Sequence, residues 1–264
     1  MPQSVRAVER ALDIMLCFSR EEPTRSLTQI AEAVQMSKTT VHRLLTTLES
    51  KRFITRDKAT GLYRLGFRLI EMASLVLQDI ELQRWAVPYL QRLSSQYDET
   101  VDMSILEGSH VMYLEVIESS QRVKIAAAVG QRLPAYFTAS GKAILAFLPQ
   151  KTVLPILEKN LAEGNSLVKR TIPEMLASLG EIRERGYAIA EEEYEPDINA
   201  VAAPLFDADH NPIASIAIVG PSFRLSRNRL PEMGEAIMQL THDISQEVGE
   251  ASLATIVSKS RPVR

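Results

Sequence analysis

Apolar positions in the first third of the chain recur at helical spacing. A first amphipathic helix is predicted by Val5, Val8, Leu12, Met15 and Leu16, and it ends near the polar cluster SREEPTR. A short second helix follows, for which Ser26 and Gln29 form a capping-box pattern. A longer third helix, with Ser37 as its natural N-cap, is predicted by the apolar stripe Val41, Leu44, Leu45 and Leu48. A short helix, a tight turn and a longer helix is the layout of a helix-turn-helix.

The third helix has a polar face that suits the major groove of DNA. Its candidate contact residues are Ser37, Lys38, Thr39, Thr40, His42, Arg43 and Thr46. Arg and Lys can read guanine, and short hydroxyls can reach phosphates or base edges. A helix face that is merely solvated would more often carry pairs of Glu and Lys, yet this face has no acid before Glu49. We therefore predict that it is a recognition helix.

The next segment, FITRDKATGLYRLG, predicts two short strands around the turn DKATG. Such a hairpin is the wing of a winged helix-turn-helix. The cations Arg56, Lys58 and Arg64 would lie against the DNA backbone or the minor groove. We place this DNA-binding domain at residues 1–66, which hold 11 Lys and Arg against 7 Asp and Glu, leaving 19 against 26 for the rest of the chain. A basic head and an acidic body fit a DNA-binding protein.

A linker helix is predicted over residues 67–81. The segment FRLIEMASLVLQDIELQ is apolar on more than one side, and a helix of this kind needs two partners. A second subunit can supply one of them.

The remainder, residues 82–264, is expected to form an α+β layer. Strands are predicted at 101–108 and 110–118 as a hairpin, and at 122–130, 187–192, 198–207 and 212–220. Helices are predicted up to residue 97 and at 141–147, 153–159, 174–185 and 229–248.

Composition narrows the class of protein. With 45% hydrophobic and 24% charged residues, the 264-residue chain resembles an ordinary globular protein of two domains. No stretch approaches the roughly 18 apolar residues that span a bilayer, and the first residues hold no apolar signal core, so a cytoplasmic protein without membrane contact is expected. The single cysteine, Cys17, is expected to be buried and to have only a packing role.

The sequence contains few features that would indicate an enzyme. The four histidines are scattered along the sequence, so we predict no metal site. Ser140 to Lys142 resembles the end of a phosphate-binding loop, but Tyr136 and Ala143 depart from that motif. Glu191 to Glu193 offers paired carboxylates, although a solvated strand entrance explains them more simply, with at most one pointing to a pocket. We predict no catalytic residue and no cofactor.

Three segments together resemble the IclR family of bacterial regulators. They are LTQIAEAVQMSKTTVHRLLTTLESKRFITRD with the following YRLG, then RLPAYFTASGKAILAFLP, and then GYAIAEEEYEPDINAVAAPLFD. The resemblance covers nearly the whole chain. It implies a GAF-like α/β effector-binding domain behind the winged helix, and a homodimer or dimer of dimers that binds a palindromic operator in double-stranded DNA.

The resemblance also implies a site for a small-molecule effector. The helix opened by Ser140 and Gly141 would anchor an anion through its backbone N–H groups. The matching cavity positions are Ile125, Leu133, Ala139, Ser140, Gly141, Ala190, Ile198, Ala200, Ala217 and Val219. Many members have an acidic residue or Ser where this chain has Ala190, Cys where it has Ala200, and a glycine where it has Asp197. An effector with an apolar body, such as an aromatic or fatty acid, is therefore expected.

These expectations combine into one hypothesis, a repressor of a catabolic operon whose DNA affinity is changed by a carboxylic or aromatic acid. An activator of the same architecture is an alternative. An enzyme with an accessory DNA-binding domain is an alternative of another class.

Overall fold

The computed structural model describes residues 5–19, 21–78, 81–164, 167 and 169–259. The chain divides into two compact units, Met1–Glu81 and Leu82–Arg264, and each is described by itself. None of the described helices is long and apolar enough to cross a membrane.

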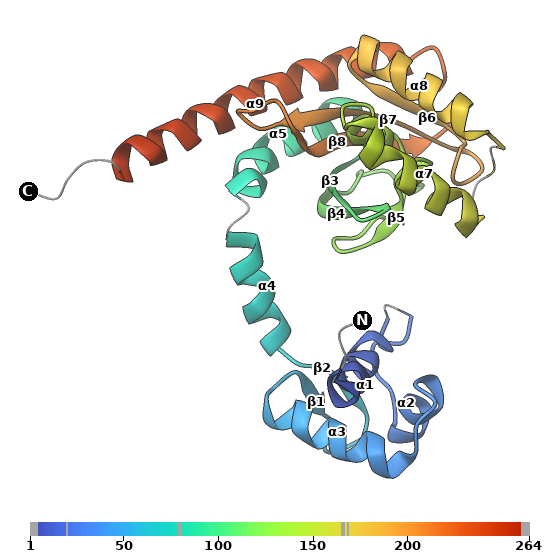
Figure 1. Ribbon diagram of the computed structural model, residues 1–264, viewed down its shortest axis with the longest axis vertical. Coiled ribbons are helices and arrows are strands. Elements are labelled where there is room, and N and C mark those ends of the chain that lie inside the picture. The colour runs from blue at the N-terminus through green and yellow to red at the C-terminus, as the bar shows by residue number, and fades with distance from the viewer. Residues whose placement is uncertain (1–4, 20, 79–80, 165–166, 168, 260–264) are drawn as a thin grey trace, which may run out of the picture. The chain divides into compact units, whose positions relative to one another are not determined.

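The N-terminal unit is a bundle of short helices with a two-stranded hairpin (Figure 1). Its elements are α1 (Arg6–Leu16), α2 (Leu27–Ala33), α3 (Lys38–Ser50), β1 (Ile54–Arg56), β2 (Tyr63–Leu65) and α4 (Arg68–Gln78). The predicted capping box is present, since Ser26 accepts from the Gln29 amide and the Gln29 side chain accepts from the Ser26 amide. Ile14, Ile30 and Leu45 are fully buried at the centre of the unit's core.

Most of the apolar stripe predicted for α1 faces away from that core, and Met15 is the member that packs against it. Val5, Val8, Leu12 and Leu16 are exposed, with Leu16 at 80% relative accessibility, whereas Ile14 is buried. The helix therefore uses one side to hold its own unit together and leaves a second apolar side uncovered.

The structure describes only part of the predicted linker helix at residues 67–81. A helix, α4, covers Arg68–Gln78, and the next, α5, covers Glu81–Tyr97, while the intervening positions 79–80 lie outside the described residues. Of the predicted apolar positions, Ile70 is exposed at 64% and Leu69 is half-buried.

The C-terminal unit is built on a six-stranded antiparallel sheet of order β5-β4-β3-β8-β7-β6. Its strands are β3 (Thr100–Glu107), β4 (His110–Ile117), β5 (Arg132–Pro134), β6 (Ala188–Glu191), β7 (Ile198–Phe206) and β8 (Pro212–Pro221). Its helices, besides α5, are α6 (Ala139–Leu145), α7 (Gln150–Glu163), α8 (Ile172–Arg185) and α9 (Leu230–Lys259). This is the predicted α+β class.

Helix α6 packs on one face of the sheet and α9 packs on the other. Because side chains alternate along a strand, one face of β7 carries Ala200 and Ala202 and the other carries Val201 and Leu205. The alanines face α6 together with Ala217 of β8. Side chains this small leave space between the helix and the sheet.

The strand predicted over residues 122–130 was wrong. The third strand of this hairpin region is β5, which pairs with β4 from Arg132 to Pro134. Residues 122–130 form a loop that bonds at its far end to Tyr113, whose carbonyl accepts from the Gly130 amide at 2.8 Å. The loop carries apolar residues without strand alternation because Ile125 faces a cavity while Val123 and Val129 lie exposed.

Candidate DNA-binding surface and effector cavity

Helix α3 buries one side and presents the other. Val41, Leu45 and Leu48 are buried against the N-terminal core. Ser37 caps the helix by accepting from the Thr40 amide at 3.3 Å, which ends the preceding turn and fixes where the exposed face begins.

The structure brings the predicted recognition-helix residues onto one surface. Those exposed are Ser37, Lys38, Thr39, His42, Arg43 and Thr46. Thr40 differs, being half-buried and within 2.9 Å of the Ser37 hydroxyl. The Thr46 hydroxyl donates to the His42 carbonyl at 2.9 Å, so its proton is used within the helix while its oxygen can still accept. The face therefore offers cations and hydroxyls together.

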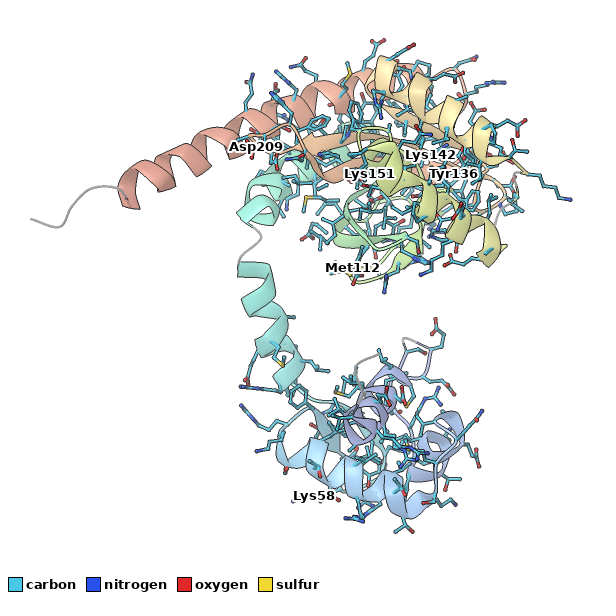
Figure 2. The ribbon with its side chains drawn as sticks, in the orientation of Figure 1. Lys58, Met112, Tyr136, Lys142, Lys151 and Asp209 are labelled. Carbon is cyan, nitrogen blue, oxygen red and sulfur yellow. The ribbon has the colours of Figure 1, made fainter. Side chains whose placement is uncertain are left out.

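Hydrogen bonds within its turn stabilise the hairpin formed by β1 and β2. Asp57 accepts from the amides of Ala59 and Thr60, and these backbone hydrogen bonds lower the pKa of the Asp57 carboxyl. Gly61 closes the turn at φ 74°, a conformation that favours glycine. The turn places Lys58 at the tip of the hairpin (Figure 2).

The wing cations differ in how firmly they are held. The Arg56 guanidinium lies 5.4 Å from the centre of the Tyr63 ring, and its Nε donates to the Gly61 carbonyl at 3.4 Å. Arg64, like Lys58, is exposed. The hairpin therefore presents three exposed cations, Arg56, Lys58 and Arg64, in the same unit as α3.

A cavity of about 360 Å³ lies between α6, the sheet and the loop before β5. This volume is in the range of small-molecule sites. Nine of the ten predicted effector residues line it: Ile125, Leu133, Ala139, Ser140, Ala190, Ile198, Ala200, Ala217 and Val219. Aromatic side chains of Tyr113, Phe137 and Tyr194 also contribute to the wall.

Gly141 is the exception, and the expectation that its N–H faces a ligand was wrong. Helix α6 starts at Ala139 with Thr138 as its N-cap, and the Gly141 amide donates to Thr138 Oγ1 at 3.0 Å. A methyl group at position 141 would collide with the Ala135 carbonyl oxygen. Gly141 therefore lets α6 approach the preceding loop, a packing role.

Sequence reasoning missed the polar group in the cavity wall. Asp102 of β3 is 1% exposed and accepts from the hydroxyls of Ser104 at 2.7 Å and Ser140 at 3.3 Å. Burial raises the pKa of its carboxyl to about 7, although the two hydroxyl donors lower it. A signal was present, because Thr100, Asp102 and Ser104 make a polar stripe along a strand whose other side is apolar. That pattern usually indicates a solvated face, but here the stripe is buried.

A second buried charge adjoins the cavity. Lys142 of α6 is 2% exposed, and its Nζ donates to Glu193 Oε1 at 2.7 Å and to the Ile189 carbonyl at 2.6 Å. Burial lowers the pKa of Lys142, and the Glu193 carboxylate raises it. Arg170 lies 3.6 Å from the same carboxylate oxygen. The pair fastens α6 to the β6 region, and Glu193 also lines the cavity.

The histidines have separate surroundings. His110 lies 3.3 Å from Glu163, and His242 lies 3.0 Å from Gln246. Across the described residues, no three His, Cys, Asp or Glu side chains gather in a way that could hold a metal ion.

Sequence comparisons match both units. The family model for the IclR helix-turn-helix domain matches residues 7–58, and the model for the bacterial transcriptional regulator IclR C-terminal domain matches residues 74–246. The chain is 31% identical over 251 residues to the HTH-type transcriptional regulator KdgR of Escherichia coli, covering 94% of each chain. It is 29% identical to KipR of Bacillus subtilis, covering 94% of this chain and 99% of the relative. The HTH-type transcriptional repressor AllR of Escherichia coli is 27% identical, with coverage of 94% and 92%.

Solved structures agree with this assignment. The Thermotoga maritima IclR structure matches with a TM-score of 0.75 and 28% identity, over 92% of this chain and 98% of that one. An IclR homolog from Microbacterium hydrocarbonoxydans, complexed with 4-hydroxybenzoate, has the same fold with a TM-score of 0.79 at 22% identity, over 92% and 98% of the two chains. From the helix-turn-helix to the effector domain, the chain belongs to the IclR family of transcriptional regulators.

Proposed function

We propose that this regulator represses a catabolic operon by inserting α3 into the major groove of its operator. The observation that carries this proposal is the exposed face of α3, where Lys38, His42 and Arg43 stand beside short hydroxyls on a rigid, capped helix. Arg56, Lys58 and Arg64 of the wing would neutralise phosphates or enter the minor groove. The related AllR, which is described as a repressor, supports the sign of regulation. An activator of the same architecture differs only in the position of its operator.

The DNA-bound form is a homodimer or a dimer of dimers. The uncovered face of α1, with Val5, Val8, Leu12 and Leu16, is an apolar surface for which a second copy is a fitting partner. Phe67, 71% exposed just before α4, adds to the apolar surface of the same unit. Paired recognition helices would read a palindrome with half-sites about 34 Å apart, or a multiple of that distance.

The effector is an aromatic or carboxylic acid with an apolar body, bound in the cavity beneath α6. Alanines and aromatic rings in the wall favour an apolar ligand, and Lys124 is a cation among the lining residues that can attract its acid group. The complex of the Microbacterium hydrocarbonoxydans homolog with 4-hydroxybenzoate supports this class. Binding changes DNA affinity only if the ligand prefers one arrangement of the oligomer. The protein acts in the cytoplasm, where its operator lies, and it binds the ligand without converting it.

A mobility shift with the upstream region of the protein's own gene tests this function. Binding should weaken steeply as salt rises, and an effector from a panel of aromatic and carboxylic acids should change the affinity. Each ligand that acts is then recovered after incubation and checked by mass. A turned-over ligand would favour the enzyme alternative, and salt-insensitive or absent DNA binding would refute the regulator.

A further inference from the structure

The cavity is apolar over most of its wall, but its buried polar groups, besides the hydroxyls of Tyr113 and Ser140, include two acidic side chains. Asp102 and Glu193 both line it and are 1% and 6% exposed. A buried carboxylate oxygen without a donor is costly, because desolvation is not repaid. A ligand that fits this cavity should therefore carry hydrogen-bond donors for these carboxylate oxygens.

The hydrogen bonds to the Asp102 carboxylate involve one of its two oxygens, Oδ1. Ser104 and Ser140 both donate to its Oδ1, and these are the hydrogen bonds that the structure gives its side chain. Among the described residues, no Lys, Arg or His lies within ion-pair distance of this carboxylate. The two hydroxyls fix the carboxylate and leave Oδ2 available to a ligand in the cavity.

Glu193 repeats the pattern. Its Oε1 is paired with Lys142 at 2.7 Å, whereas its Oε2 is buried and has no hydrogen-bond partner among the described residues. The wall thus contains two carboxylate oxygens that can each accept a further hydrogen bond.

Cations are scarce in the same wall. Of the residues that line the cavity in the described part of the chain, the one cation is Lys124, whose ammonium lies 2.7 Å from Glu118. Glu195 adds another acid. This charge balance favours a ligand that brings hydrogen-bond donors to the buried part of the site.

We propose that the effector is an aromatic compound with a hydroxyl or amino group, and that this group donates a hydrogen bond to Asp102. The proposal rests on the proposed function and specifies the ligand of that site. The aromatic body would lie among Tyr113, Phe137 and the alanines of the sheet, and Glu193 Oε2 would accept from a second donor. Asp102 thereby becomes the specificity-determining residue of the cavity.

Matched pairs of ligands test the proposal. The probes are 4-hydroxybenzoate with 4-methylbenzoate, 3-hydroxybenzoate with 3-methylbenzoate, and 4-hydroxyphenylacetate with 4-methylphenylacetate. Each pair has nearly the same shape but differs in one donor. Binding to the full chain is measured by titration calorimetry at pH 8, above the raised pKa of Asp102, which is about 7. For at least one pair the hydroxyl compound should bind at least tenfold more tightly, because a site built for a hydroxyl rejects the analogue that lacks it.

Variants assign the preference to Asp102. Asp102→Val removes the acceptor and should reduce the preference to within about threefold, while Asp102→Asn, which keeps an uncharged acceptor, should fall between this variant and the wild type. Asp209→Asn, in the exposed turn between β7 and β8, is the matched control and should keep the wild-type preference. Circular dichroism of each variant verifies folding, and Asp102→Asn carries the test if Asp102→Val does not fold.

The results that would overturn this proposal differ from those that would refute the proposed function as a DNA-binding regulator. A methyl compound that binds as tightly as its hydroxyl partner, a preference that survives in both Asp102 variants, or no binding by any of the six probes would overturn the donor assignment. Loss of salt-sensitive DNA binding by the wild-type protein would instead refute the proposed function.

Discussion

Lys142 Nζ lies 2.7 Å from Glu193 Oε1, and both side chains are almost completely withdrawn from solvent. The pair joins a helix to a loop more than fifty residues further along the chain. Since Glu193 also contributes to the cavity wall, the same carboxylate helps to hold α6 on the sheet and borders the proposed effector cavity. The stability of the domain and the shape of its site are therefore coupled.

Removing the cation of this pair should destabilise the C-terminal unit. Lys142→Met leaves Glu193 buried with Arg170, 3.6 Å away, as its remaining cation, and breaking a buried pair typically costs about 3–5 kcal/mol. Urea unfolding followed by tryptophan fluorescence and circular dichroism measures the loss. The double variant Lys142→Met/Glu193→Gln should recover part of it, since no unpaired charge remains. Equal stability of wild type and Lys142→Met would contradict the importance of the pair.

Two glycine substitutions should have opposite signs. Gly141→Ala drives a methyl group into the Ala135 carbonyl and should destabilise the protein by about 1–3 kcal/mol or more. Gly180→Ala, in the middle of α8, meets no atom within 4 Å and should stabilise it by about 0.5–1 kcal/mol. Thermal unfolding of both variants provides the comparison. A stabilising Gly141→Ala would show that α6 can shift away from Ala135.

Two cations of the N-terminal unit should affect DNA binding differently. Arg43→Ala on α3, the proposed recognition helix, should cost about 1–3 kcal/mol and relax the choice of base at one operator position. Lys58→Ala at the tip of the wing should weaken binding to all sequences alike and reduce the salt slope by about 1. Fluorescence anisotropy with operator variants at several salt concentrations separates the two effects. The matched control is Lys151→Ala, an exposed lysine of α7 in the other unit. An unchanged operator affinity in Arg43→Ala would remove α3 from the interface.

Asp102 should make stability depend on pH. Burial raises its pKa from 3.8 to about 7, so the folded protein holds this proton more tightly than the unfolded chain does. The corresponding stability is fully present below about pH 4 and is lost as the pH rises through 7. Between about pH 5.5 and pH 8 the wild type should therefore lose roughly 2 kcal/mol more than Asp102→Asn does. Urea unfolding at both pH values measures the difference, and parallel losses would mean that Asp102 is already ionised at the lower pH.

Local signals explain which parts of the fold could be predicted. The boundaries of α2 and α3 follow from Ser26, Gln29 and Ser37, whose side chains act on amides within three residues. The strands β7 and β8 follow from apolar runs separated by a turn. In both cases the determining contacts lie close together in the sequence. The cavity positions on the small-residue strands came from the family resemblance, not from periodicity.

Features that depend on distant contacts were missed. The polar stripe containing Asp102 has the alternation of a strand with one wet face, and it is buried because α6 covers it from almost forty residues away. The start of α6 was predicted at Ser140 and Gly141, but the helix begins at Ala139, because Thr138 is its N-cap and accepts from the Gly141 amide. The loop at residues 122–130 has strand-forming composition, but Ile125 lines the cavity while Val123 and Val129 are exposed, so its apolar side chains do not alternate between two faces of a sheet.

The seating of α6 against Ala135 has a consequence for redesign. A methyl group at position 141 would collide with the Ala135 carbonyl, so any side chain there would force a shift of α6, the roof of the cavity, or of the loop that contains Ala135. The floor is different, because Ala190, Ala200 and Ala217 line the cavity from paired strands, so a larger side chain at any of the three would reduce the cavity volume. Biosensors for new metabolites are thus best sought by varying these three floor positions and leaving the helix untouched.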